Sequence, residues 1–281
     1  MRWEITILMG LCVWLSGAAA LANSPLYGAD SIVDYQAFRS IEQKAESGDA
    51  KAQFELYNLY GLKKDYARAY EWSEKAADNG YAEALRWSFM RYDDGGNFSD
   101  YRTKIDYPKA FQRLKQLEVV DPEGAWFHLG IYYRYGKGVK RDYMLAFHYF
   151  SLRANPDKPE VSPDFWAQIE LGNIYAKGLG IKRDDISAYV WYGLGSEQWL
   201  QYQDHPSDKC GTYIDSYCDD GRYEKISAHR EKLRRRLTIA GLQTAQSRMK
   251  AFRDKYPLAL GTVGSCEPSV VTIPPPIPIN Q

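Results

Sequence analysis

A 42-residue internal duplication constrains the fold of this chain more than any other feature of its sequence. Residues 129–146 align with residues 171–188 without a gap. Self-similarity at a fixed period of this length is typical of repeat proteins, in which each repeat packs on its neighbours. The chain is therefore expected to fold as a row of similar repeats. The identical residues include Leu129, Gly130, Tyr133, Gly136, Gly138, Asp142 and Ala146, each with its counterpart 42 residues later.

Each repeat begins with a pattern that predicts an amphipathic helix, which we call helix A. An alanine, a leucine and a tyrosine follow one another at intervals of four residues, and this spacing keeps all three on one helical stripe. The pattern occurs four times, with serine in place of leucine in the second copy. The four copies are Ala52/Leu56/Tyr60, Ala84/Ser88/Tyr92, Ala125/Leu129/Tyr133 and Ala167/Leu171/Tyr175.

A second helix, helix B, is predicted after a turn in every repeat. Its signature is an aspartate, an alanine four residues later, and an aromatic residue three residues after that, with arginine once in the aromatic place. Aspartate is a preferred N-cap, because its carboxylate accepts hydrogen bonds from the free N–H groups of the first turn. Helix, turn and helix in tandem predict an α-solenoid. The copies are Asp65/Ala69/Trp72, Asp106/Ala110/Arg113, Asp142/Ala146/Tyr149 and Asp184/Ala188/Trp191.

The chain divides into regions of different character around these repeats. The expected helices are 33–47, 50–60, 66–79, 81–92, 107–119, 123–135, 143–154, 164–177, 185–196, Glu224–Arg236 and Ile239–Lys255. The expected regions are a repeat domain at 23–196 with an N-terminal capping helix, an insertion loop at 197–222, a closing helical pair at 223–256 and a Pro-rich disordered tail at 257–281.

The first 22 residues have the pattern of a signal peptide. A short positive start precedes an apolar run from Ile5 to Leu15, and small residues around Ala20-Leu21-Ala22 fit a cleavage site. The apolar run is shorter than the ~20 residues of a transmembrane helix. We therefore expect cleavage after Ala22, a periplasmic location, and no membrane span in the mature protein.

Three cysteines, Cys210, Cys218 and Cys266, follow the predicted cleavage site. In an oxidising compartment the nearest pair, Cys210 and Cys218, is the simplest disulfide, and it would lie in the insertion loop. The sequence leaves connectivity open, because Cys266 is either free or the true partner of one of the others. The spacing of His205, Cys210 and Cys218 is not that of a closed zinc site.

Composition and motifs argue against several classes of function. Lys+Arg and Asp+Glu are both 36, so bulk charge does not favour binding to nucleic acid. Four histidines and four cysteines offer little material for a metal centre. The Gly-x-Gly segments at 136–138 and 178–180 lack the preceding strand and the lysine of a phosphate-binding loop, so they are interpreted as repeat turns. We expect no cofactor, no metal and no enzymatic activity.

The repeat motifs resemble the Sel1-like repeat, a relative of the tetratricopeptide repeat. The resemblance lies in Leu129-Gly130-x2-Tyr133-x2-Gly136-x-Gly138-Val139-x2-Asp142-x3-Ala146, in the matching segment that runs from Leu171 to Trp191, and in the repeat ending Ala76-Ala77-x2-Gly80. It covers roughly 34 to 196, and the second repeat departs most from it. It implies an all-α, right-handed α-solenoid of Sel1-like helical hairpins, here with a disulfide-containing insertion near the C-terminal end.

The resemblance also implies a protein-binding surface. In related tetratricopeptide folds, fixed positions on helix A line the concave face. Carried onto this sequence, they are Lys51, Phe54, Asn58, Glu83, Arg86, Met90, Gly124, Phe127, Ile131, Trp166, Ile169 and Asn173, with Arg134 and Lys177 on the lower rim. The competing interpretation is that Phe127, Ile131 and Ile169 simply pack against neighbouring helices. In the basic run that ends at Arg236, Arg234 and Arg235 belong either to a solvated helix face or to a docking patch for an acidic partner.

Three classes of function remain open. The leading hypothesis is an exported, non-enzymatic scaffold, and the combination of signal peptide and Sel1-like repeats resembles immunity proteins that neutralise type VI secretion effectors such as lipases. The second is a periplasmic regulator that binds a sensor kinase or an envelope complex. The third is a weak hydrolase or a penicillin-binding factor. It is disfavoured because similar cysteine-rich proteins have a disulfide in each repeat, whereas here the repeats contain no cysteine.

Overall fold

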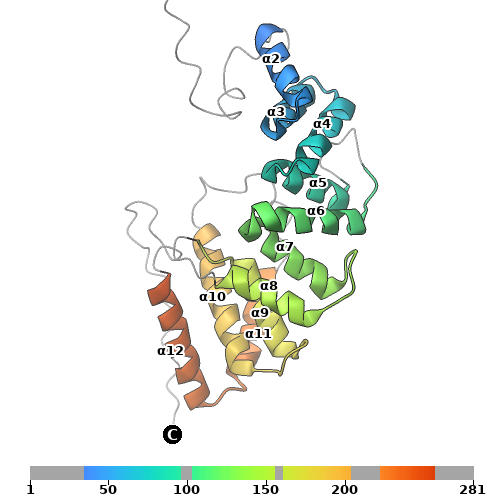
Figure 1. Cartoon of the computed structure of the whole chain (residues 1–281). Coiled ribbons are helices and arrows are strands. Elements are labelled where there is room, and N and C mark those ends of the chain that lie inside the picture. The colour runs from blue at the N-terminus through green and yellow to red at the C-terminus, as the bar shows by residue number, and fades with distance from the viewer. Residues whose placement is uncertain (1–34, 96–102, 156–160, 204–221, 257–281) are drawn as a thin grey trace, which may run out of the picture. The chain divides into compact units, whose positions relative to one another are not determined.

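The computed structural model describes residues 35–95, 103–155, 161–203 and 222–256, and these residues form helices and connecting turns without any strand. The prediction of an all-α fold is confirmed. The expected signal peptide, the three cysteines with their disulfide, and the Pro-rich tail lie outside the described residues. Figure 1 shows the helices in chain order.

Every expected helix has a counterpart. The helices are α2 (Tyr35–Glu46), α3 (Ala50–Leu62), α4 (Tyr66–Asp78), α5 (Ala82–Asp94), α6 (Tyr107–Val120), α7 (Pro122–Tyr135), α8 (Tyr143–Ala154), α9 (Phe165–Lys177), α10 (Asp185–Gln203), α11 (Arg222–Arg234) and α12 (Ile239–Lys255). The hairpins of the four repeats are thus α3–α4, α5–α6, α7–α8 and α9–α10, which we number first to fourth.

The repeated aspartates cap helix B of every repeat, as predicted. The Asp65 carboxylate accepts a hydrogen bond from the Arg68 backbone N–H at 3.2 Å at the start of α4. The other three do the same for their own first turns: Asp106 for Lys109 at 3.0 Å, Asp142 for Met144 at 2.9 Å, and Asp184 for Ile186 at 2.9 Å. The local sequence therefore sets where each helix B begins.

The expected end of the last repeat helix, at residue 196, was wrong, because α10 continues to Gln203. Three contacts fix the additional turns. Glu197 pairs with Arg253 of α12 at 2.8 Å, the Gln198 side chain donates to the Pro163 carbonyl at 2.6 Å, and Trp199 packs against a buried cluster. These partners are distant in sequence, so the repeat period gives no sign of them.

Contacts within the chain divide it into two compact units. The first unit runs to Ala125 and includes the turn residues Lys137–Val139, and the second comprises Trp126–Gly136 and the residues from Lys140 onward. Within the first unit, α2, α3 and α4 enclose a core of repeat residues such as Leu56, Tyr60 and Ala69. The α5–α6 hairpin buries its own apolar residues, including Leu85, Phe89, Leu114 and Leu117.

The second unit shows why the repeat motif contains Leu-Gly. A Cβ on Gly172 would lie 2.7 Å from the Tyr192 ring, and one on Gly130 would lie 2.5 Å from the Phe150 ring. Glycine therefore lets an aromatic ring of helix B lie directly on helix A. Around these contacts, Leu171 and Ile174 are buried with Phe150 in one cluster.

Candidate protein-binding surface

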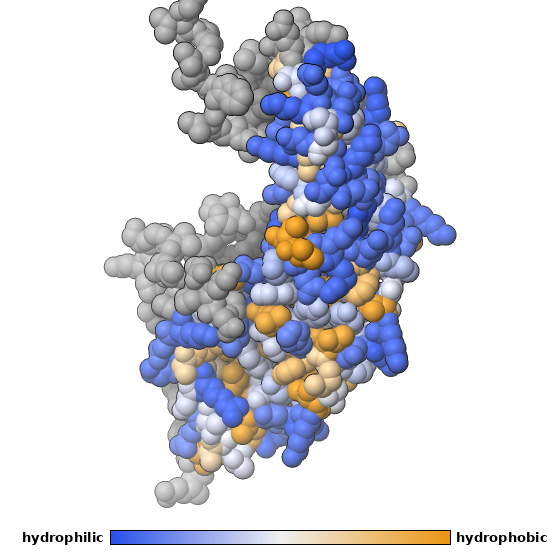
Figure 2. Space-filling view, in the orientation of Figure 1, coloured by the Kyte–Doolittle hydropathy of each residue, from blue (hydrophilic) through white to orange (hydrophobic). Residues whose placement is uncertain are grey.

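The residues that the resemblance places on a binding surface lie on helices α3 and α5 of the first unit and on α7 and α9 of the second. Figure 2 shows that the face turned to the viewer mixes hydrophilic residues with small groups of apolar ones.

On α3, Phe54 is half-buried and lies between two other rings. Its ring is stacked on Tyr57 with centroids 5.1 Å apart, and the Tyr81 ring lies 5.2 Å away. Lys51 is exposed and Asn58 is half-buried on the same helix. Phe54 therefore offers one edge to a partner while its position is fixed by aromatic neighbours.

On α5, the Arg86 side chain remains 46% exposed although it forms an ion pair with Asp121. Asp121 also accepts a hydrogen bond from the Gly124 N–H at 3.1 Å, so it caps the helix that follows. Met90 is half-buried and Glu83 is exposed on the same helix. Arg86 is thus held in place by a partner and still available to bind another protein.

The sequence analysis missed Trp87, which is 36% exposed beside Arg86. It occupies the position directly before the repeat leucine site. In the other three repeats this position is polar, since it holds Glu55, His128 and Glu170. A large aromatic residue at a position that is otherwise polar was the available signal.

In the second unit, Arg134 and Asn173 are brought together by a residue that the sequence analysis also missed, Glu170. Arg134 is buried and forms an ion pair with Glu170. The Asn173 amide donates to Glu170 at 3.4 Å and accepts from the Tyr192 hydroxyl at 2.8 Å. Burial raises the pKa of Tyr192 to about 12, and the charge of Arg134 opposes this rise. These groups join α7, α9 and α10 inside the second unit, so they contact one another rather than stand free at the surface.

Several aromatic and aliphatic members of the predicted surface pack within the second unit, as the competing interpretation expected. Phe127 lies 5.9 Å from the Phe150 ring and, with Ile131, packs against the α8–α9 core. Ile169 is only 5% exposed. Trp166 is half-buried beside Phe165 and keeps part of its ring at the surface.

The remaining predicted residues are cations at the surface. Lys177 is exposed at the end of α9. Arg234, the last residue of α11, and Arg235, which follows it, are exposed and share one carboxylate, Glu231, at 2.7 and 3.0 Å. Hydrogen bonds from these two arginines lower the pKa of Glu231 to about 2. The basic run is thus partly neutralised by Glu231 of α11.

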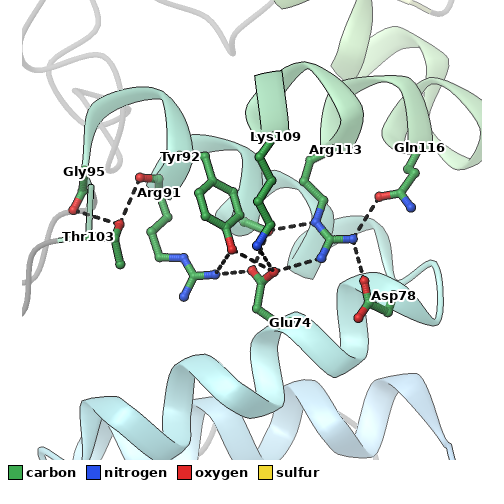
Figure 3. Close-up of polar contacts among 10 residues, drawn as sticks. Glu74, Asp78, Arg91, Tyr92, Gly95, Thr103, Lys109, Arg113 and Gln116 are labelled. Carbon is green, nitrogen blue, oxygen red and sulfur yellow. Dashed lines mark hydrogen bonds and ion pairs between the residues drawn. The ribbon is translucent and has the colours of Figure 1, made fainter. Parts of the chain in front are cut away.

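A buried charge network holds the second hairpin, and we call it the Glu74 network (Figure 3). The Glu74 carboxylate of α4 forms ion pairs with Arg91 of α5 and with Arg113 of α6, the latter at 2.8 Å. It also accepts from the Ser88 hydroxyl at 2.6 Å and from the Tyr92 hydroxyl at 3.0 Å.

The electrostatics of the Glu74 network favour the ionised carboxylate. Burial opposes the charge of Glu74, but Arg91, Ser88 and Arg113 together hold its pKa below the usual value. Arg113 also pairs with Asp78 at 2.7 Å and donates to Ser88 at 3.1 Å. Ser88 is 1% exposed, so no substrate reaches its hydroxyl. The network acts as a structural lock.

Metal binding and membrane insertion find no support in the described residues. Within that part of the chain, no group of three or more histidine, cysteine, aspartate or glutamate side chains is placed to hold a metal ion. None of the helices that the structure describes is both long and apolar enough to cross a membrane.

The fold and this surface define a protein built of tandem helical hairpins. The Sel1 repeat family model matches residues 50–81, 126–154 and 167–198. These segments correspond to the first, third and fourth hairpins. The chain therefore contains Sel1 repeats in these three segments, as the repeat motifs predicted. Sel1 repeat proteins serve as protein-interaction scaffolds and are generally not catalytic.

The solved structures that match this chain are only distantly similar to it. One is a protective antigen present in uropathogenic Escherichia coli strains that displays an SLR fold, at 22% identity and a TM-score of 0.44, with 83% of this chain and 53% of that chain covered. This chain thus spans about half the length of that protein. Another is a Sel1 repeat protein from Oxalobacter formigenes, at 24% identity and a TM-score of 0.45, covering 70% and 78%. A Sel1 repeat protein from Klebsiella pneumoniae is 19% identical, with a TM-score of 0.39 and coverage of 76% and 98%. A comparison with curated proteins gave no match.

Proposed function

We propose that this protein is an exported, non-catalytic scaffold that binds another protein through helix A of its repeats. One observation carries the proposal: recognition-type side chains on helix A stay partly exposed after the core has formed, among them Phe54, Arg86 and Trp166. Aromatic residues and arginine supply most of the binding energy at protein interfaces. The interaction role of Sel1 repeats in general supports the same conclusion.

The specific form of this proposal is an immunity protein of the periplasm. It would bind an antibacterial effector of the type VI secretion system, such as a lipase, and cover its active site. The support is the signal-peptide pattern of the first 22 residues together with the resemblance of an exported Sel1 protein to such immunity proteins.

Co-purification from the periplasm of the native host tests the scaffold function. The tagged full chain is crosslinked in cells and compared with the double variant Arg86→Ser/Trp87→Ser. We expect a defined partner with the unchanged chain and a strongly reduced yield with the variant. The variant should keep its thermal unfolding midpoint, because the exposed Arg86–Asp121 pair contributes only about 0–1 kcal/mol.

A triple variant at exposed cations away from helix A, Lys44→Gln/Lys104→Gln/Lys232→Gln, is the matched control and should retain the partner. Equal recovery of the partner with the Arg86/Trp87 variant would show that the interface does not lie on α5. Identification of the partner then tests the immunity role: the purified chain should abolish the hydrolytic activity of a lipase partner. Recovery of a sensor kinase instead would show that the immunity role is wrong and the scaffold role right.

A further inference from the structure

A basic dipeptide recurs at the turns of the third and fourth repeats of the second unit. Lys140-Arg141 precedes Asp142, and Lys182-Arg183 precedes Asp184, again 42 residues later. The aspartates are used as N-caps of α8 and α10. The four basic residues, unlike the aspartates, do not cap a helix, and all four are exposed.

The two turns lie side by side. A Cβ on Gly180 would be only 2.7 Å from Cβ of Tyr143, so the turn after α9 rests on the first residues of α8. The guanidinium group of Arg141 lies over the Tyr143 ring, 5.2 Å from its centroid. Tyr143 is therefore contacted both by the turn that carries Lys182 and by Arg141 of the preceding turn.

A surface depression of about 680 Å³ opens beside these turns. Phe147 and Tyr175 form part of its floor, with their rings edge to face and their centroids 5.5 Å apart. Ile181 and Ile186 add aliphatic surface to the lining. In Figure 2, apolar residues lie among hydrophilic ones over α8 and the turn that follows α9. The depression is large enough for one or two side chains of a bound peptide.

The acidic residues of the lining are already engaged. Asp184 accepts hydrogen bonds from the Ile186 N–H at 2.9 Å and the Ser187 hydroxyl at 2.6 Å. Asp185 pairs with Arg183 at 2.8 Å and with Arg236 at 3.0 Å. The negative charge at the rim is thus neutralised by neighbours of the same unit.

The cations of the two turns, in contrast, outnumber the acidic groups that pair with them. Among the described residues, Lys140 and Lys182 form no ion pair, and Arg141 contacts only the Tyr143 ring. Arg248 adds a further positive charge, with its guanidinium 3.2 Å from the Ser187 hydroxyl. Lys182 therefore presents an unpaired positive charge in the lining of the depression, and Lys140 and Arg141 add positive charge at the neighbouring turn.

We propose that this basic turn surface, made of Lys140, Arg141, Lys182 and the adjoining depression, binds an acidic extended segment of a partner protein. Carboxylates of the segment would pair with the three cations, and one aromatic or aliphatic side chain would enter the depression. The inference rests on the scaffold function proposed above and adds a second contact, separate from helix A, with a stated partner chemistry. A lipid surface would meet the cations but leave the recessed Phe147–Tyr175 floor unfilled.

Fluorescence anisotropy with short synthetic peptides on the full chain tests the proposal. The probes are an acidic Asp/Glu peptide with a central tryptophan, the same peptide with serine in the centre, and a neutral Asn/Gln peptide with the tryptophan. We expect the first to bind most tightly. Its affinity should fall at least roughly tenfold in Lys140→Gln/Arg141→Gln/Lys182→Gln, because three opposite charges lose their partners.

The control Lys44→Gln/Lys104→Gln/Lys232→Gln removes the same charge from exposed cations elsewhere and should change the affinity by less than about twofold. Equal losses in the two triple variants would overturn the proposal, since binding would then follow net charge only. Equal affinity for the tryptophan and serine peptides would show that the depression is not part of the binding site. Binding to phosphatidylglycerol vesicles without binding to any peptide would assign the surface to a membrane.

The outcome is independent of the helix A test. A partner captured through Arg86 and Trp87 and retained by Lys140→Gln/Arg141→Gln/Lys182→Gln, together with no peptide binding, would refute the basic turn surface and leave the scaffold function intact. Peptide binding at the turns without any partner captured through helix A would refute the proposed helix A interface instead.

Discussion

The second and fourth hairpins reach the same arrangement with opposite chemistry. In α9–α10, Leu171 is 1% exposed in an apolar cluster against which Trp191 packs. In α5–α6, the corresponding positions hold Ser88 and Arg113, which are equally buried and hydrogen-bonded to each other at 3.1 Å. One hairpin is closed by apolar packing, and the other by a carboxylate from the preceding helix.

The difference shows what a repeat position requires. A buried serine and arginine are tolerated where leucine and tryptophan stand elsewhere, because Glu74 supplies the charge and the acceptors they need. The Sel1 repeat family model matches the fourth hairpin but leaves the second unmatched. The hairpin is therefore retained where the motif is lost, provided that the buried groups find partners.

Loss of Glu74 should have the largest effect. In Glu74→Ala, the guanidinium groups of Arg91 and Arg113 stay buried without their shared carboxylate, and we expect a loss of about 3–5 kcal/mol in the opening free energy of α5 and α6. Hydrogen exchange of peptides from 82–120 measures it. In the control Asp78→Ala, where the carboxylate removed is 64% exposed, the loss should be about 0–1 kcal/mol. Similar values for both variants would show that the network is not a lock.

The apolar hairpin should respond to a cavity. Leu171→Ala removes buried methyl groups from the α8–α9 cluster, and the expected loss is about 2–5 kcal/mol in the opening of α9 and α10. The same exchange experiment checks it. Protection of α5 and α6 serves as the internal reference, and a loss confined to those helices would contradict the assignment of Leu171 to the core of the fourth hairpin.

Substitution of the motif glycine tests overpacking instead of a cavity, and the expected loss of stability is smaller. Gly172→Ala places a methyl group against the Tyr192 ring and should cost about 1–3 kcal/mol through overpacking. Gly61→Ala meets nothing within 4 Å and should be neutral or slightly stabilising. The second hairpin has Phe89 at the position of Gly172. This sensitivity to overpacking is therefore expected only in the hairpins that have glycine at this position. Thermal unfolding of the two variants decides the point, and a harmless Gly172→Ala would refute the close approach.

Acidification should reduce the stability that Glu74 gives to the second hairpin. The pKa of Glu74 is lowered in the folded protein, so its contribution to stability is complete above the unfolded value of about 4.5 and is lost as pH falls through the folded value. The stability difference between the unchanged chain and Glu74→Gln should therefore shrink below about pH 4.5. A difference that stays constant between pH 7 and pH 3 would show that Glu74 is not ionised in the network.

Glu231 offers an exposed counterpart of Glu74, since it also serves two arginines. Its pKa of about 2 should return toward 4.5 in Arg234→Ala/Arg235→Ala, as followed by NMR titration of its side chain. The unfolding temperature should hardly change, because exposed ion pairs contribute little to stability. A marked fall in that temperature would mean that the basic run of α11 has a structural role like that of the Glu74 network.

The helices and their caps could be predicted from the sequence because their signals are local. The repeated aspartates and the four-residue spacing lie within single helices, as at Asp142 and Ala146. Glu74 could not be found in this way, because it lies 14 and 39 residues from the Ser88 and Arg113 that it binds. Without knowledge of Glu74, Ser88 and Arg113 can be recognised only as departures from the repeat motif.

The candidate surface stays a prediction, but the exposure of its members shows what the sequence could not give. Arg86 of the helix A set keeps an exposed side chain, whereas Arg134, expected on the lower rim, is buried and paired with Glu170 of the next helix A. Periodicity identifies which face a residue is on, but not whether a neighbouring repeat supplies a countercharge that draws the side chain inward. Trp87 was missed because it lies off the repeat stripe.

The coupling free energy between Glu74 and Arg113 tests most directly that the second hairpin is a true repeat closed by a shared carboxylate. A double-mutant cycle with Glu74→Ala, Arg113→Ala and the combined variant, measured by hydrogen exchange of α5 and α6, isolates it. The account predicts a coupling of about 1–3 kcal/mol, with the double variant less destabilised than the sum of the single ones. A coupling below about 0.5 kcal/mol would contradict it, because the two side chains would then contribute independently.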